Sequence, residues 1–150
     1  MFRIWFVSIA FASILAPGKC RAADPAATFF DPSSRIFIGI ELQAAHPYLA
    51  EYERVLTISK AGSFSNRLPL VRDTGGYAAA NLYRCAGNAF MLDTYYESVV
   101  VYGDTGSFHS GRCLGEAIYI GIFDGAGSRS WRFYPASQRR EVKLEMRGGH

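Results

Sequence analysis

Short apolar runs rich in β-branched residues, separated by turn residues, occupy the chain after residue 35 and limit what it can fold into. Runs of four to nine residues with this character suit strands, and no segment carries a long apolar repeat of helical period. The connections are rich in Gly, Asp, Asn and Ser, which favour turns. We expect an all-β fold, an antiparallel β-sandwich or a small meander barrel, with about eight strands. The expected strands are 36–42, 52–60, 79–85, 89–92, 98–103, 117–123, 130–135 and 141–147.

The segment 46–62 leaves helix and strand open. Tyr48, Leu49 and Tyr52 fall at helical spacing, whereas the second half of the segment alternates and is β-branched. We expect a strand over 52–60, with at most one short helical turn before it.

The first 22 residues have the three parts of an export signal. Arg3 supplies the positive end, an apolar run of about 13 residues follows from Ile4 to Ala16, and small residues come after Pro17. We expect cleavage between Ala22 and Ala23. The run is shorter than the ~20 residues of a membrane-spanning helix, so an uncleaved anchor is the less favoured alternative.

This leader sets the expected domain organisation and location. Residues 1–22 are a signal peptide, 23–34 an extended lead-in rich in Pro, Ala and Ser, 35–147 a single β domain and 148–150 a disordered tail. The mature protein is expected to be periplasmic or secreted, without a membrane span.

Loss of the leader also changes the charge. Three of the 16 Lys and Arg residues lie in the leader and none of the 13 Asp and Glu residues does, so the mature chain carries 13 charges of each sign. A formal net charge of zero, without a block of basic residues, gives no electrostatic case for a nucleic-acid partner.

The cysteine count falls from three to two on processing. Cys20 lies in the leader, and the remaining pair, Cys85 and Cys113, is expected to form a disulfide in an exported protein. Closing the loop of 28 residues from Cys85 to Cys113 stabilises a fold by about 3–4 kcal/mol in the chain-entropy model. A buried thiol pair or a metal site is the alternative, but no histidine lies at ligand spacing, and we expect no metal.

The triplet Asp-Thr-Gly begins at Asp73 and again at Asp104, and it resembles the motif of aspartic proteases. Those enzymes need two carboxylates that share one proton. The 31 residues between the two aspartates cannot hold the lobe that separates them in a single-chain enzyme, so only a dimerising, retroviral-type subunit using Asp73 or Asp104 fits the length. Arg72, directly before Asp73, opposes proton sharing. Because Asp-Thr-Gly is also a natural turn, we favour two turns.

The loop 103–113 contains the residue types of a hydrolase triad, Asp104, Ser107 and His109. Residues crowded on one turn rarely place a base between a nucleophile and a carboxylate, so we expect no catalytic residues. No phosphate-binding, dinucleotide or paired-cysteine zinc motif occurs, and we expect no cofactor.

Aromatic and arginine content is the remaining functional signal. The chain is 15% aromatic, and Tyr and Arg side chains anchor interfaces and stack on ligands. Adjacent Tyr95 and Tyr96 are expected to point to opposite faces, so that one is exposed. Phe108 and His109 lie on the loop that the disulfide would hold. These four residues are the candidate binding residues.

In compartment, size and disulfide the chain is similar in kind to small periplasmic inhibitor or immunity proteins such as lysozyme inhibitors, although it does not carry their residue motifs. We therefore expect an exported, non-enzymatic binding module that acts on a protein or glycan of the cell envelope. The alternatives are the aspartic protease above and a structural component of the envelope.

Overall fold

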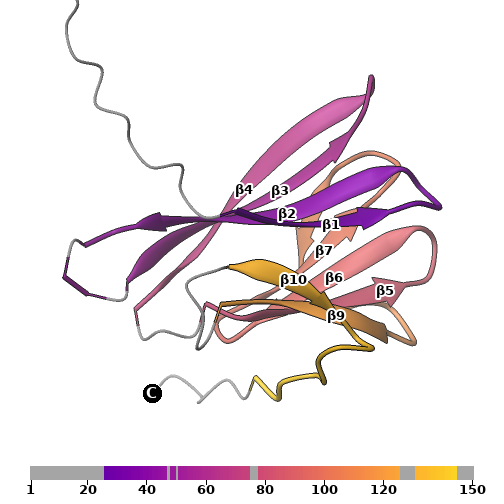
Figure 1. Cartoon of the computed structure of the whole chain (residues 1–150). Coiled ribbons are helices and arrows are strands. Elements are labelled where there is room, and N and C mark those ends of the chain that lie inside the picture. Colours follow the sequence, from indigo (N-terminus) through magenta and orange to yellow (C-terminus); the bar gives the residue numbers. More distant parts are fainter. Residues whose placement is uncertain (1–25, 47, 50, 75–77, 126–130, 145–150) are drawn as a thin grey trace, which may run out of the picture.

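Two antiparallel sheets stack on each other to make the fold (Figure 1). The computed structural model describes residues 26–46, 48–49, 51–74, 78–125 and 131–144. The four-stranded sheet has the order β1-β2-β3-β4, with β1 Ala26–Asp31, β2 Ile36–Ala44, β3 Tyr52–Lys60 and β4 Phe64–Asp73. The six-stranded sheet has the order β10-β9-β5-β6-β7-β8, with β5 Ala80–Cys85, β6 Ala89–Thr94, β7 Ser98–Tyr102, β8 Phe108–Ser110, β9 Ile118–Asp124 and β10 Arg132–Pro135. The predicted all-β, sandwich-like fold is confirmed, and no described residue is helical.

The core lies between the two sheets and follows the alternation of the strands. Alternate residues of β2 and β3 are apolar and fully buried at Ile36, Ile38, Ile40, Leu56 and Ile58, and these side chains meet the inward residues of β5, β6 and β9. Burying each large aliphatic side chain stabilises the fold by about 2 kcal/mol. The six-stranded sheet contributes further fully buried members, among them Leu82, Phe90, Leu92, Val101 and Phe123.

Most of the expected strands are present with nearly the expected bounds. The ambiguous segment resolves as predicted: β3 runs from Tyr52 to Lys60, and no helical turn precedes it among the described residues. Two strand glycines lie against close neighbours: a Cβ on Gly39 of β2 would lie 2.8 Å from Thr57 Oγ1, and one on Gly121 of β9 would collide with Phe133.

Strand β1 falls in the segment expected to be a lead-in. All six of its residues pair with β2, and Ala27 is buried against the core. Residues 26–31 therefore belong to the four-stranded sheet and are not a lead-in. The sequence analysis missed this strand because the segment is rich in Pro, Ala and Ser, although Ala27 and Phe29 alternate with outward residues and pack against the core.

Two further strands were not expected. Strand β4 contains Pro69 and several polar residues, which lower its strand signal, but β4 is an edge strand where a proline is tolerated. Strand β8 is a three-residue edge strand within the loop predicted for residues 103–113.

The strand predicted at 141–147 is wrong over the residues described. Residues 141–144 have no strand partner and cross the outer face of the six-stranded sheet, and 145–147 lie outside the described residues. Strand β5 lies inside the sheet, so it offers no free edge; instead the Asn81 side chain donates to the Val142 carbonyl at 2.7 Å and accepts from the Val142 amide at 3.3 Å. We call residues 136–144 the C-terminal strap.

The predicted disulfide is confirmed. Cys85 ends β5, Cys113 follows β8, and their Cα atoms lie 5.6 Å apart. The bond ties the loop 111–117 to the six-stranded sheet. The expected leader, 1–22, and tail, 148–150, lie outside the described residues, and among those that are described there is no helix of the length and apolarity needed to span a membrane.

Candidate functional site: the two outer faces of the sandwich

The two Asp-Thr-Gly aspartates lie at opposite ends of β6. Asp104 accepts a hydrogen bond from Asn88, just before β6, at 2.6 Å. Asp73 accepts one from the hydroxyl of Tyr96, just after β6, at 3.3 Å. A six-residue strand spans about 20 Å, so the two carboxylates do not form a dyad within one chain.

The expected turn is present at Asp104, and the turn expected to begin at Asp73 continues into residues 75–77, which lie outside the described residues. Asp104 is exposed in the turn between β7 and β8. Asp73 is fully buried as the last residue of β4. The sequence motif is therefore shared by two residues in unlike environments.

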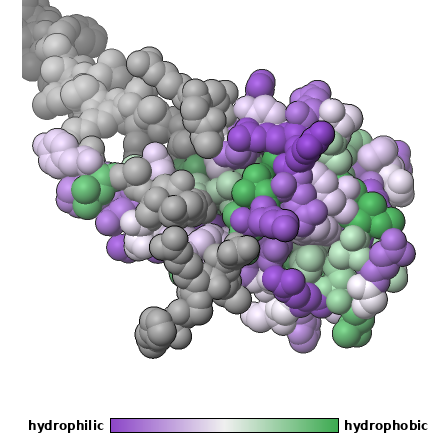
Figure 2. Space-filling view, turned by 90° about the horizontal axis from the view of Figure 1, so that it is seen from below, coloured by the Kyte–Doolittle hydropathy of each residue, from purple (hydrophilic) through white to green (hydrophobic). Residues whose placement is uncertain are grey.

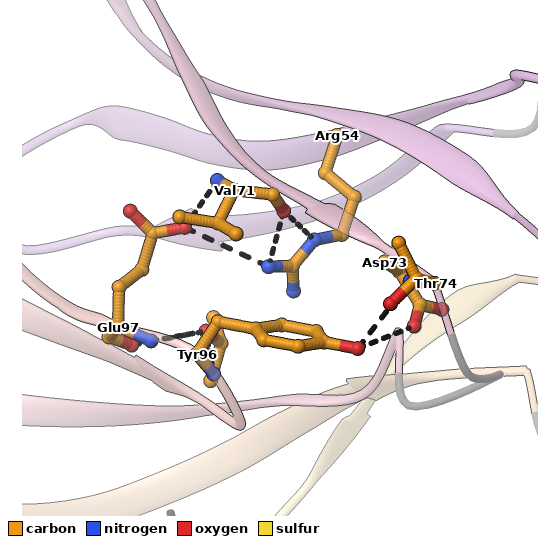
Figure 3. Close-up of polar contacts among 7 residues, drawn as sticks. Arg54, Val71, Asp73, Thr74, Tyr96 and Glu97 are labelled. Atoms are coloured by element: carbon orange, nitrogen blue, oxygen red, sulfur yellow. Dashed lines mark hydrogen bonds and ion pairs between the residues drawn. The ribbon is translucent and has the colours of Figure 1, made fainter. Parts of the chain in front are cut away.

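A buried arginine occupies the space beside Asp73 (Figure 3). Arg54 of β3 has a fully buried side chain, and its Nε and Nη2 donate to the Val71 carbonyl at 2.9 and 2.7 Å. Nη2 also lies 3.6 Å from Glu97 Oε1, which accepts from the Val71 amide. The guanidinium packs over the ring of Tyr96, 5.3 Å from the ring centroid.

The contacts of this cluster join the two sheets to each other. Its donors and acceptors come from β3 and β4 of one sheet and from the turn between β6 and β7 of the other. Burial lowers the pKa of Arg54, and the charges of Glu97 and Asp73 oppose that shift. Breaking a buried pair of this kind leaves a charge uncompensated, which costs about 3–5 kcal/mol. The cluster therefore fixes how the sheets are stacked.

The four candidate binding residues do not converge. Tyr95 and Tyr96 do not point to opposite faces, because both sit half-buried in the bend between β6 and β7, with their rings edge to face and centroids 5.1 Å apart. Phe108 packs against the main core. His109 is exposed, and its ring meets that of Tyr102. Among the hydrogen bonds of the described residues, none joins His109 to Asp104 or Ser107.

The outer face of the six-stranded sheet is covered. The C-terminal strap crosses it, with Tyr83 donating to Glu141 at 2.7 Å and Tyr119 to the Arg139 carbonyl at 3.1 Å. The loop 111–117 lies over its other half, where Cys113 packs with a small cluster that includes Met91 and Val100. Viewed from below, the described surface mixes hydrophilic and hydrophobic residues without one continuous apolar patch (Figure 2).

The two tyrosines that contact the C-terminal strap, Tyr83 and Tyr119, have raised pKa values. Burial, the hydrogen bond to Glu141 and the charge of Glu141 raise the pKa of Tyr83 well above its ordinary value of 10. Burial, followed by the charge of Glu141, also raises the pKa of Tyr119. Both tyrosine hydroxyl groups therefore stabilise the folded protein while they are protonated.

The outer face of the four-stranded sheet has no such cover among the described residues. Strand pairing places Phe30, Phe37, Ser59 and Ser65 side by side in one row across β1 to β4. Phe30 and Phe37 are 47% and 42% exposed, and their ring centroids lie 4.6 Å apart.

The next rows of this face are polar. Thr28 and Thr57 flank Gly39 and close over it, since a Cβ on Gly39 would lie 2.8 Å from Thr57 Oγ1 and 3.3 Å from Thr28 Oγ1. An exposed ion pair between Arg67 and Glu41, 2.6 Å apart, lies beyond. At the other end of the face a hollow of ≈470 Å³ is lined by Phe37 and residues 59–65, which form the turn between β3 and β4. We call this surface the open face, and it comprises Thr28, Phe30, Phe37, Gly39, Glu41, Thr57, Ser59, Ser65 and Arg67.

The described residues hold no cluster of three or more His, Cys, Asp or Glu side chains that could bind a metal ion. No protein-family model matches the chain, and neither a curated protein nor a solved structure matches it significantly. The geometry of the open face and of the buried cluster is therefore the basis for a functional assignment.

Sequence reasoning missed both features, although each has a signal in the alternation of its strand. Phe37 has the opposite parity to Ile36 and Ile38, which places it on the other face of β2. Arg54 has the same parity as the buried Leu56 and Ile58, which places an arginine on the core face of β3.

Proposed function

We propose that the chain is an exported binding module that engages a partner in the cell envelope through the open face. The exposed pair of Phe30 and Phe37 is the observation that carries the proposal. Exposed aromatic side chains provide large contact areas at low entropic cost and concentrate binding energy. The rigid sheet beneath them, stacked through the Arg54 cluster, preorganises the surface.

The open face is the candidate site that the described residues form best, because its aromatic pair is exposed and four paired strands hold its side chains in register. Export is the expectation from the leader, and it makes an envelope or extracellular partner the reasonable choice. The proposed site is therefore the open face and not the loop of Phe108 and His109.

The test is retention on a washed envelope fraction by the processed protein. Phe37→Ser is expected to reduce retention at least tenfold without changing the melting temperature by more than a few degrees, because the side chain is outside the core. Leu114→Ser is the matched control, since Leu114 is 94% exposed but lies on the loop 111–117. Equal retention of wild type and Phe37→Ser, or loss of retention in Leu114→Ser alone, would show that another surface binds.

The location has a separate test. The amino-terminal residue of protein recovered from the periplasm or medium should be Ala23. A chain recovered with Met1 intact would contradict export by cleavage.

A further inference from the structure

We infer that the partner of the open face is a saccharide chain, with a sugar ring stacked on the Phe30–Phe37 pair. This inference rests on the proposed function and names the chemistry of its ligand. It is drawn from three properties of the face: its aromatic platform, its uncommitted hydroxyl groups and its size.

The aromatic pair gives a sugar ring an apolar surface to pack on. The two rings are tilted by 33° and their centroids are 4.6 Å apart, so they stack on each other, and Phe37 is the member that also lines the hollow, together with Ser59 and Ser65. Pyranose rings have an apolar face of axial C–H groups, which packs on an aromatic ring, and a polar rim of hydroxyl groups. A ligand stacked on Phe37 would have its rim over the serine and threonine residues of the neighbouring strands.

Those neighbours offer hydrogen bonds that the fold does not use. The hydroxyl groups of Thr28, Thr57, Ser59 and Ser65 make no hydrogen bond within the described part of the chain. A hydroxyl both donates and accepts, which suits a polyhydroxylated ligand better than a surface of one polarity. Lys60, in the wall of the hollow, forms no ion pair with a described residue and adds a donor.

The hollow beside Phe37 has the size of a small-molecule site. A hollow of ≈470 Å³ is within the range of small-molecule sites, about 300–1,000 Å³.

The experiment titrates the processed protein with soluble hexasaccharides of β-1,4-linked glucose and of β-1,4-linked N-acetylglucosamine, and with solubilised peptidoglycan glycan strands, by calorimetry. We expect at least one of these to bind with a Kd of 1 mM or tighter. Phe37→Ala should weaken binding at least tenfold and Phe37→Trp should retain it, since a larger ring still stacks. The double variant Thr57→Val, Ser59→Ala should weaken binding about threefold to tenfold, and Leu114→Ser should leave it unchanged.

Three outcomes overturn the inference. If no saccharide of the panel binds at 10 mM, or if Phe37→Ala binds as well as wild type, the face does not hold a sugar. If envelope retention depends on Phe37 but is lost when the envelope fraction is treated with protease, the partner is a protein; the proposed function then survives and the saccharide assignment fails. If the protein is a dimer that Phe37→Ser dissociates, the occupant of the face is a second copy of the chain.

Discussion

The outer faces of the two sheets differ in what their outward side chains meet. On the six-stranded sheet Met91 and Val100 are only 5% and 6% exposed, because they pack in a cluster with Tyr83 and the two disulfide cysteines. On the four-stranded sheet Phe30 and Phe37 are nearly half exposed. Outward apolar residues thus form a small second core on the six-stranded sheet, whereas on the four-stranded sheet they remain available for binding. Each prediction below perturbs one side of this comparison or the contact that holds the two sides together.

The largest expected effect comes from the contact that both faces depend on. Arg54→Ala should lower the free energy of unfolding by about 3–5 kcal/mol, because it removes the bonds to Val71 and leaves Glu97 and Asp73 without their cation. The measurement is urea unfolding. Arg72→Ala is the matched control: Arg72 pairs with Glu53 at the surface, with its side chain 52% exposed, so its loss should cost less than about 1 kcal/mol. Equal costs for the two variants would mean that the buried cluster does not join the sheets.

The second effect uncovers part of the covered face. The double variant Cys85→Ser, Cys113→Ser should lose about 3–4 kcal/mol, the value expected for a bridge with a sequence separation of 28 residues. Hydrogen exchange should rise in the loop 111–117 and in β8 more than in β1 to β4. If exchange rose first in the four-stranded sheet, the covered and open faces would not be independent.

The third effect is a loss of stability in acid, and it involves Asp31 in the hairpin of β1 and β2. Burial would raise the pKa of Asp31, but hydrogen bonds from Arg84 and Ser34 and the charge of Arg84 outweigh burial and hold this pKa below its ordinary value. The stabilisation is therefore present above the unfolded pKa of about 3.9 and is lost as pH falls through the folded value. Asp31→Asn should cost about 2 kcal/mol at neutral pH and flatten the stability profile below pH 4. Exposed Asp104→Asn is the control, and an equal flattening there would assign the acid dependence elsewhere.

The smallest effect concerns alkali and the strap. The pKa of Tyr83 is raised, so its contribution is complete below pH 10 and is lost as pH rises through the folded value. Tyr83→Phe should cost about 1 kcal/mol at neutral pH and reduce the fall in stability above pH 10, with a residual slope from Tyr119. Tyr102→Phe, at a residue exposed to 38%, should change neither quantity. A wild-type profile that is flat above pH 10 would contradict the role of Tyr83.

The sequence predicted the fold class because alternation and turn residues are local properties. It predicted β2, β3, β5 and β6 well, since their apolar residues are buried on at least one face. It missed β4 because the side chains of an edge strand can be polar and include a proline without breaking the sheet. It placed a strand at 141–147 because Val142 and Leu144 alternate with charges, whereas the backbone there bonds to the side chain of Asn81.

The candidate site could be predicted less well, since it depends on pairing. The row from Phe30 to Ser65 exists only in the register of four strands, which no single strand specifies. Tyr96 and Phe108 were reasonable candidates by residue type, but tertiary contacts placed one in the Arg54 cluster and the other against the core. Residue type alone does not say which aromatic side chain remains exposed.

Trp131 gives the sandwich an intrinsic fluorescent probe. Its indole N–H donates to the Ile40 carbonyl at 3.0 Å and so connects the edge of one sheet to the other. The chain has two tryptophans, and Trp5 belongs to the expected leader. Emission from the processed protein would then come from one fluorophore at the seam of the sandwich, and a red shift on denaturation would report separation of the layers without any label.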